Sequence, residues 1–218
     1  MVLSDTIELR SFKQGDVCCQ VLAVRRCGER IAAVKHKPQN PEGCAQSVRS
    51  VVNTDGLAGF FRAVAAEHPD PLAICMVCIG TDRSTGDAYG PLVGTYLTEY
   101  GWPSVIGTLK EPCDAVRLQS AGHSLPEGKL VIAIDACLGK PDSVGSYVVG
   151  AGPLRPAEAV GRPFVEIGDY SVAGVVNRMG IKPYWILQGT SLHLVMEMAR
   201  QTAAVIRQAW TPEYTGKG

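Results

Sequence analysis

The sequence predicts an α/β protein with a mostly parallel central sheet. Short, continuous apolar runs alternate with helical patterns from about residue 54 to residue 210, and no internal repeat or low-complexity tract interrupts them. Apolar runs of this kind are typical of strands that are buried on both faces. With 218 residues, 46% of them hydrophobic, the chain is long enough to bury a core of its own.

The first 45 residues differ from the rest of the chain. Three short apolar pieces, TIELRSF, VCCQVLAV and RIAAVKH, are separated by polar breaks and end in the turn-rich segment KPQNPEG. We expect residues 1–45 to form a small β-rich appendage and residues 46–218 to form the α/β domain.

The elements of the α/β domain can be placed in chain order. A helix is expected from an N-cap at Thr54 or Asp55 to the HPDP segment, where a proline ends it. A long amphipathic helix at 190–210 is expected to begin at a cap on Thr190 or Ser191. Between them we expect strands at 72–80, 104–109 and 129–136, helices at about 90–100 and 114–121, and shorter strands in GSYVVGAGPL, PFVEIGDY and SVAGVVN.

Charge and hydropathy disfavour several classes of partner. The 21 Lys and Arg residues balance 21 Asp and Glu residues, and no block of like charge marks a surface for nucleic acid or an anionic membrane. No apolar run reaches the roughly 20 residues of a membrane span, and the N-terminus lacks the pattern of a secretion signal. We therefore expect a cytoplasmic protein whose eight cysteines are reduced and mostly structural.

Two aspartates after predicted strands are the main candidate residues. Ligands of open α/β sheets bind at the carboxyl ends of the strands. Asp135 directly follows the apolar run LVIAI, and Asp87 lies in the Gly-rich loop CIGTDRSTGDAYGPLVG. Asp135 can be a turn or cap residue, Asp87 can cap the next helix, and Asp82 is typical of a loop tip. If the two strands are neighbours, Asp87 and Asp135 converge at one edge of the sheet.

Two converging carboxyl groups can perform acid–base chemistry. Within about 5 Å of each other they share a proton, so that one takes a proton from water while the other donates a hydrogen bond to a scissile carbonyl. Arg83, Ser84 and Thr85 supply donors that can hold a substrate backbone or an oxyanion. The same pair can instead bind a divalent metal, with Asp169 of EIGDYS as a third oxygen ligand.

The Gly-rich loop does not match phosphate-binding patterns. A Walker A loop has four residues between its glycines and then a lysine, whereas Gly80 and Gly86 are separated by five residues and Asp87 follows. The GxGxxG pattern of dinucleotide sites is absent as well. Because a negative charge at this position would repel a phosphate, nucleotide binding is disfavoured.

The cysteines offer a weaker alternative. Cys75 and Cys78 form a CxxC inside a predicted strand, where residues three apart point to opposite faces and cannot share a zinc ion. Cys137, two residues after Asp135, is placed as a nucleophile near a predicted strand end. It would need an activating base, for which His123 and His193 are the candidates.

Five ordered blocks of the sequence resemble a known family. They are CIGTDRSTGDAYGPLVGT, YGWPSVIGTLKEPCDAV, VIAIDACLGKPDSVGSYVVGAGPLRP, IGDYSVAGVVNRMG and YWILQGTSLHLVMEMA, and together they span about residues 70–207. They resemble the YyaC-type sporulation proteins of spore-forming bacteria, often described as spore proteases. That family is similar in turn to the germination protease, which degrades small acid-soluble spore proteins, and more distantly to hydrogenase maturation endopeptidases.

The resemblance implies a fold, an activity and site residues. The fold would be a three-layer phosphorylase/hydrolase-like fold with helices on both sides of a mostly parallel sheet. Segments of the germination protease similar to GDAYGP and AIDAC each supply a catalytic aspartate, which implies catalytic roles for Asp87 and Asp135. In the maturation endopeptidases the corresponding acidic positions bind nickel together with a later histidine. The similar segment here, EIGDYSVAG, contains Asp169 and Ser171 but no histidine.

Three hypotheses of function follow. The first is a sporulation-associated peptidase without a cofactor, which uses Asp87 and Asp135 on peptides or small spore proteins and acts as a monomer or a homo-oligomer. The second is a regulatory spore protein that binds peptides without cleaving them. The third is a metal-dependent maturation endopeptidase with a divalent ion at Asp87, Asp135 and Asp169. Neither nucleic acid nor a membrane is expected as a partner in any of them.

Overall fold

A mixed six-stranded sheet forms the centre of the computed structural model, which describes residues 8–11, 20–23, 49–114, 125–154 and 166–211. The strand order is β3-β7-β8-β6-β4-β5. Strands β8, β6, β4 and β5 pair in parallel, whereas β7 is antiparallel to both β3 and β8. The elements of this sheet and its helices are β3 (Ser50–Val52), α1 (Thr54–Glu67), η1 (Pro71–Ala73), β4 (Ile74–Cys78), η2 (Gly86–Ala88), α2 (Tyr89–Glu99), β5 (Val105–Ile106), β6 (Leu130–Gly139), η3 (Pro141–Ser143), β7 (Tyr147–Ala151), β8 (Tyr170–Arg178), α4 (Pro183–Gln188) and α5 (Leu192–Trp210). The predicted α/β class is confirmed.

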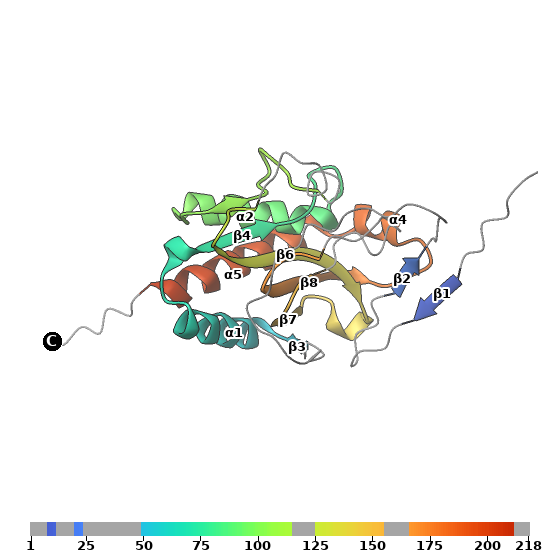
Figure 1. The fold of residues 1–218 in the computed structure, drawn as a ribbon. Coiled ribbons are helices and arrows are strands. Elements are labelled where there is room, and N and C mark those ends of the chain that lie inside the picture. The colour runs from blue at the N-terminus through green and yellow to red at the C-terminus, as the bar shows by residue number, and fades with distance from the viewer. Residues whose placement is uncertain (1–7, 12–19, 24–48, 115–124, 155–165, 212–218) are drawn as a thin grey trace, which may run out of the picture.

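The main core lies between the helices and one face of the sheet. Side chains of α1, α2, α4 and α5 form a single buried cluster with alternate residues of the strands, and Figure 1 shows the three longest helices lying along the sheet. A smaller cluster on the other face is formed, within the described ranges, by strand and loop residues: Cys75, Val77, Ile79, Val131, Ala133, Leu154 and Ile167. The helix expected at 114–121 lies, apart from Asp114, outside the described residues. A third layer is therefore not confirmed.

The two longest helices, α1 and α5, each begin at a polar side chain that accepts a backbone N–H. Asn53 caps α1, because its extended backbone turns its side-chain oxygen to accept the Gly56 N–H at 3.0 Å. The expected caps Thr54 and Asp55 lie instead in the first turn, so that prediction is wrong by one residue. Ser191, one of the two residues expected, caps α5.

The strands match the apolar runs more closely at some points than at others. β4 falls inside the predicted range 72–80, and β6 runs beyond the predicted end at residue 136 to Gly139. Residues 166–169 form no strand, although Leu154 and Ile167 form an isolated bridge and the Asp169 N–H donates to the Val131 carbonyl at 2.7 Å. Gly168 has a φ of +99°, which breaks the extended backbone before β8.

The N-terminal region contains a pair of strands. β1 (Glu8–Ser11) and β2 (Gln20–Ala23) pair antiparallel in a sheet of their own, within two of the three predicted apolar pieces. The third piece, RIAAVKH, lies outside the described residues, and the division of the chain near residue 45 stays a prediction. In the part of the chain that the structure describes, no helix has the length and apolar character needed to cross a membrane.

Candidate functional site

Asp135 lies on β6 at the level where the neighbouring strand β4 ends. The last backbone bond from the β4 side runs from the Ile79 N–H to the Ile134 carbonyl at 2.7 Å. Asp135 is the next residue along β6, and on the other side of β6 it is paired with Ala173 of β8. The strand predicted at 129–136 already included Asp135, and the structure confirms this placement. The residue lies inside β6, beside the point where β4 ends and the loop after β4 begins.

The loop after β4 turns back so that Asp87 comes to lie beside Gly80. The Asp87 carbonyl accepts the Thr81 N–H at 3.2 Å. Gly80 has a φ of +143°, and a Cβ there would stand 2.0 Å from the Asp87 carbonyl oxygen. Only glycine permits this approach. The turn therefore returns Asp87 to the end of β4, next to Asp135 on the adjacent strand.

Asp87 does not cap the helix that follows it. It is the middle residue of the 3-10 turn η2, which continues directly into α2. The N-cap positions of η2 and α2 are Thr85 and Ala88, and neither makes a side-chain capping bond. The helix-cap interpretation of Asp87 is therefore wrong.

The two carboxyl groups interact electrostatically. Burial raises the pKa of Asp135 well above its usual value; the Ala136 N–H, which donates to Asp135 Oδ1 at 2.7 Å, lowers it, and the nearby charge of Asp87 raises it further. Burial also raises the pKa of Asp87, while the Ser84 hydroxyl beside it lowers that pKa. Both residues remain partly exposed. The structure thus brings together two carboxyl groups that resist simultaneous ionisation.

The core holds the turn that carries Asp87. Tyr89 is fully buried, its hydroxyl is 2.9 Å from Thr202 Oγ1 of α5, and its ring fills the space that a Cβ at Gly174 would enter. On the other side, Gly86 packs against Leu187 of α4. The position of Asp87 is therefore set by contacts with α4, α5 and β8.

The other loop residues proposed for the site are arranged unequally. Asp82 and Arg83 are exposed at the loop tip, where the Thr81 hydroxyl accepts the Arg83 N–H at 3.3 Å. Thr85 is partly buried, whereas Ser84 is only 5% exposed. Of the three donors that the sequence suggested, Ser84 is the one enclosed with the carboxyl groups.

Asp169 does not join the pair. Its carboxylate accepts the Val131 N–H at 2.8 Å near the start of β6, and it is exposed. Because Asp135 follows four residues later on the same strand, the two sites are about 13 Å apart along it. Within the described residues, no three His, Cys, Asp or Glu side chains are grouped so that they could hold a metal ion. A metal site formed by Asp87, Asp135 and Asp169 is therefore wrong.

The cysteines divide between the two faces of the sheet as predicted. Cys75 belongs to the smaller core cluster and Cys78 to the larger one, which confirms that the CxxC cannot bind one metal. Cys137 is partly buried inside β6 rather than at a strand end. Of its two candidate bases, His193 is exposed near the start of α5 and His123 lies outside the described residues.

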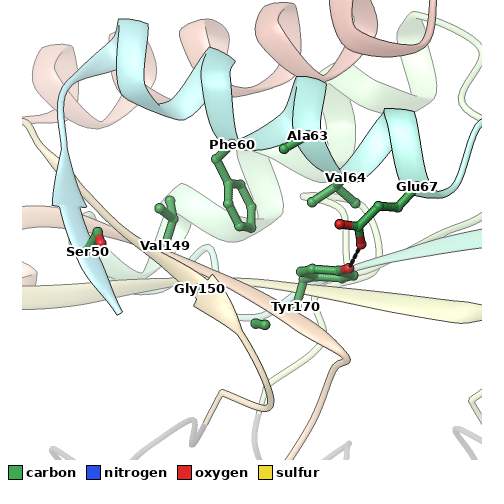
Figure 2. A pocket seen from close by; sticks show the side chains of 9 residues that line it. Ser50, Phe60, Ala63, Val64, Glu67, Val149, Gly150 and Tyr170 are labelled. Carbon is green, nitrogen blue, oxygen red and sulfur yellow. Dashed lines mark hydrogen bonds between the residues drawn. The ribbon is translucent and has the colours of Figure 1, made fainter. Parts of the chain in front are cut away.

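A separate pocket of about 260 Å³ lies between α1 and strands β3, β7 and β8. Figure 2 shows Phe60 and Val149 on its apolar side and, at its other end, the Tyr170 hydroxyl, which donates to the Glu67 carboxylate at 2.8 Å. Tyr170 begins β8, three residues before Ala173, the strand partner of Asp135, so the pocket lies on the amino-terminal side of the carboxyl pair along that strand. Sequence reasoning missed it because its lining comes from four separate elements and no motif marks it.

Fold and site together define an α/β protein with two interacting, partly buried carboxyl groups beside the end of a parallel strand. The chain belongs to the family described as "Protein of unknown function (DUF1256)", whose model matches residues 52–205. It is 47% identical over 135 residues to "Uncharacterized protein YyaC" of Bacillus subtilis (strain 168). The aligned region covers 60% of this chain and 66% of that relative. The chain thus spans slightly less than two thirds of its relative's length. No solved structure gives a significant match.

Proposed function

We propose that this protein is a peptidase in which Asp87 and Asp135 act together as an acid–base pair, one as the general base and the other as the general acid. The observation that carries the proposal is the pair itself: burial raises the pKa of both carboxyls, and the charge of one acts on the other. Such a pair holds one proton between its members over a range of pH. It therefore offers a base and an acid at the same time, which hydrolysis of an amide requires.

An apolar surface beside the pair supports a protein substrate. Helix α4 packs on η2 through Leu187, and its outer side chains Tyr184 and Trp185 are 51% and 64% exposed, next to a fully exposed Ile181. Large exposed apolar groups that cluster in this way are typical of surfaces that bind another chain. A peptide that lies across η2 would place apolar side chains on α4 and a peptide bond at the carboxyl groups.

The cellular setting and the finer fold class rest on the family resemblance. Within this proposal the protein acts in the cytoplasm of a spore-forming bacterium, on peptides or small spore proteins. Its fold is of the three-layer phosphorylase/hydrolase-like type. Residues 1–45 form a separate appendage to the peptidase-like domain. A homo-oligomer is compatible with the proposal and is not required by it.

The test is cleavage of a peptide library by the full-length protein and by Asp87→Asn and Asp135→Asn. Because general acid–base groups contribute about 10²–10⁴-fold, each substitution should lower the rate at least 100-fold, and the double variant should be little worse than either. Asp82→Asn is the matched control, since this exposed aspartate lies in the same loop, and it should cleave as the wild type does. Wild-type rates in both single variants would refute the proposed mechanism.

A regulatory role in peptide binding is the second candidate, because the exposed residues of α4 would serve it equally well. Equilibrium binding of the same peptides separates the two. Binding that survives in Asp87→Asn, in a protein whose wild type cleaves no peptide, would favour the regulatory role. Cleavage that both Asn substitutions abolish would favour the peptidase.

A further inference from the structure

The hydroxyl of Ser84 is a buried polar group whose role neither the fold nor the family explains. The residue is 5% exposed. In the described part of the chain, its Oγ is one of two buried side-chain polar atoms without a hydrogen bond of full geometry. A buried polar group left unsatisfied costs about 1–3 kcal/mol. A serine at this position therefore needs a reason beyond packing.

The Asp87 carboxyl is the group that the Ser84 hydroxyl can serve. Ser84 and Asp87 lie three residues apart in one turn, which the bond from the Ala88 N–H to the Ser84 carbonyl closes at 3.0 Å. Side chains three residues apart on such a turn are neighbours. The hydroxyl stands close enough to lower the pKa of Asp87, although it does not reach the geometry of a full hydrogen bond.

The surroundings of the two carboxyls are unequal. Asp135 receives one backbone N–H, from Ala136, and its pKa is raised well above the usual value by burial and by the charge of Asp87. Asp87 lies beside a hydroxyl whose hydrogen bond to the ionised carboxylate is stronger than its bond to the protonated carboxyl, and the pKa of Asp87 is raised less far than that of Asp135. The negative charge is therefore favoured on Asp87 and the proton on Asp135.

We propose that Ser84 is a positioning residue that keeps Asp87 ionised, so that Asp87 is the base of the pair and Asp135 the acid. This inference rests on the proposed function and assigns its roles. Asp87 takes a proton from water as the water oxygen bonds to the carbonyl carbon, and Asp135 gives its proton to the carbonyl oxygen. When the C–N bond breaks, the proton on Asp87 passes to the leaving nitrogen, and a hydroxyl proton of the intermediate returns to Asp135.

Other titratable groups lie on the elements that pack against η2. They include Tyr89 on α2, Tyr184 on α4, His193 and Glu197 on α5, and Cys137 on β6. The pKa of Asp87 is lowered by the Ser84 hydroxyl, and that of Asp135 is lowered by the Ala136 amide and raised by the charge of Asp87. Ser84 is therefore a side chain outside the pair whose removal is expected to move the proton.

The test is titration of the aspartate carboxyl carbons by ¹³C NMR in the full-length protein. Ser84→Ala should shift the titration of Asp87 to higher pH and narrow its separation from that of Asp135. Ser84→Thr, which restores a hydroxyl, should titrate as the wild type does. Ser84→Cys, close in size but a weaker donor, should shift Asp87 in the same direction as Ser84→Ala. Where cleavage is measurable, the acid limb of the pH–rate profile should move with Asp87.

A matched control and a further variant make the result decisive. Ser104 is partly buried toward the amino-terminal end of the parallel strands, where its carbonyl accepts the Met76 N–H at 3.0 Å, and Ser104→Ala should leave both titrations unchanged. The inference is overturned if Ser84→Ala and Ser84→Cys leave Asp87 unmoved, or if Ser104→Ala moves it equally. If Asp135→Asn leaves the titration of Asp87 unchanged, the pair is uncoupled and the proposed function fails, whereas the Ser84 variants still report on Ser84 alone.

Discussion

Replacing Asp135 with asparagine should stabilise the protein near neutral pH. Asp135 is partly buried and its pKa is raised well above the usual value, first by burial. In the unfolded chain its pKa is about 3.9. Between these two values the folded protein keeps a proton that the unfolded chain has lost, so the contribution of Asp135 to the free energy of unfolding falls as the pH rises through this window. Asparagine is always neutral and avoids that loss.

The size of the effect follows from the same comparison. Each unit of difference between the folded and unfolded pKa corresponds to about 1.4 kcal/mol. Asparagine keeps an oxygen for the Ala136 N–H that Asp135 Oδ1 accepts at 2.7 Å, so this bond need not be lost. Its new amide group can cost about 1 kcal/mol if it finds no partner. We expect a net gain of at least about 1 kcal/mol at pH 7, and no gain near pH 4.

Urea unfolding of the wild type and of Asp135→Asn at several pH values between 4 and 8 measures this difference. The quantity to follow is the difference in free energy of unfolding between the two proteins, because other groups titrate in both. Asp82→Asn, at an exposed position, should differ from the wild type by no more than about 0.5 kcal/mol at each pH. A difference for Asp135→Asn that stays constant with pH, or that favours the wild type at pH 7, would refute the reasoning. The same variant should lose peptide cleavage, which would make it more stable and less active.

Three further predictions concern the surroundings of the pair. Tyr89→Phe removes one of two partners of the buried Thr202 hydroxyl, which also donates to the Met198 carbonyl at 2.9 Å, and should cost about 0.5–1.5 kcal/mol in urea unfolding; a cost near zero would show that this bond does not hold the turn. Gly80→Ala places a Cβ 2.0 Å from a carbonyl oxygen and should cost at least about 3 kcal/mol from clash and strain together. Gly101→Ala, also at positive φ but with nothing within 4 Å, should cost no more than about 2 kcal/mol, and equal losses at the two glycines would contradict the close approach. Trp185→Ala should weaken peptide binding by about 1 kcal/mol, or roughly fivefold, while leaving the unfolding free energy within about 0.5 kcal/mol; unchanged binding would remove α4 from the proposed substrate surface.

The sequence was most informative where burial dictates residue type. The apolar runs that became β4 and the first half of β6 could be placed because strands buried on both faces leave few alternatives. The meeting of Asp87 and Asp135 could be anticipated because both follow such runs and parallel neighbours present the same ends at one edge of the sheet. Neither inference needed a long-range contact to be known.

Elsewhere the outcome depended on contacts that a sequence pattern does not show. The last residues of β6, Cys137 to Gly139, are neither β-branched nor aromatic, and they are extended because β8 pairs with them. Asn53 and Thr54 are both residue types that cap helices well. Asn53 is the cap because the extended backbone before the helix ends at this residue. Asp169 lies before its strand rather than after it, which the segment EIGDYS alone does not reveal.

Two backbone contacts divide the Gly-rich loop into a base and a tip that differ in how well they should tolerate inserted residues. Gly80 touches the Asp87 carbonyl, and a Cβ at Gly90 would stand 2.0 Å from the Ile79 carbonyl oxygen, so both sides of the loop base are closed on the end of β4. Asp82 and Arg83 stand beyond this closure, exposed at the tip. Insertions at the tip should therefore leave the carboxyl pair in place, whereas a single inserted residue between Gly86 and Gly90 would shift it. The residues at the loop tip can therefore change without a change in the backbone that positions Asp87.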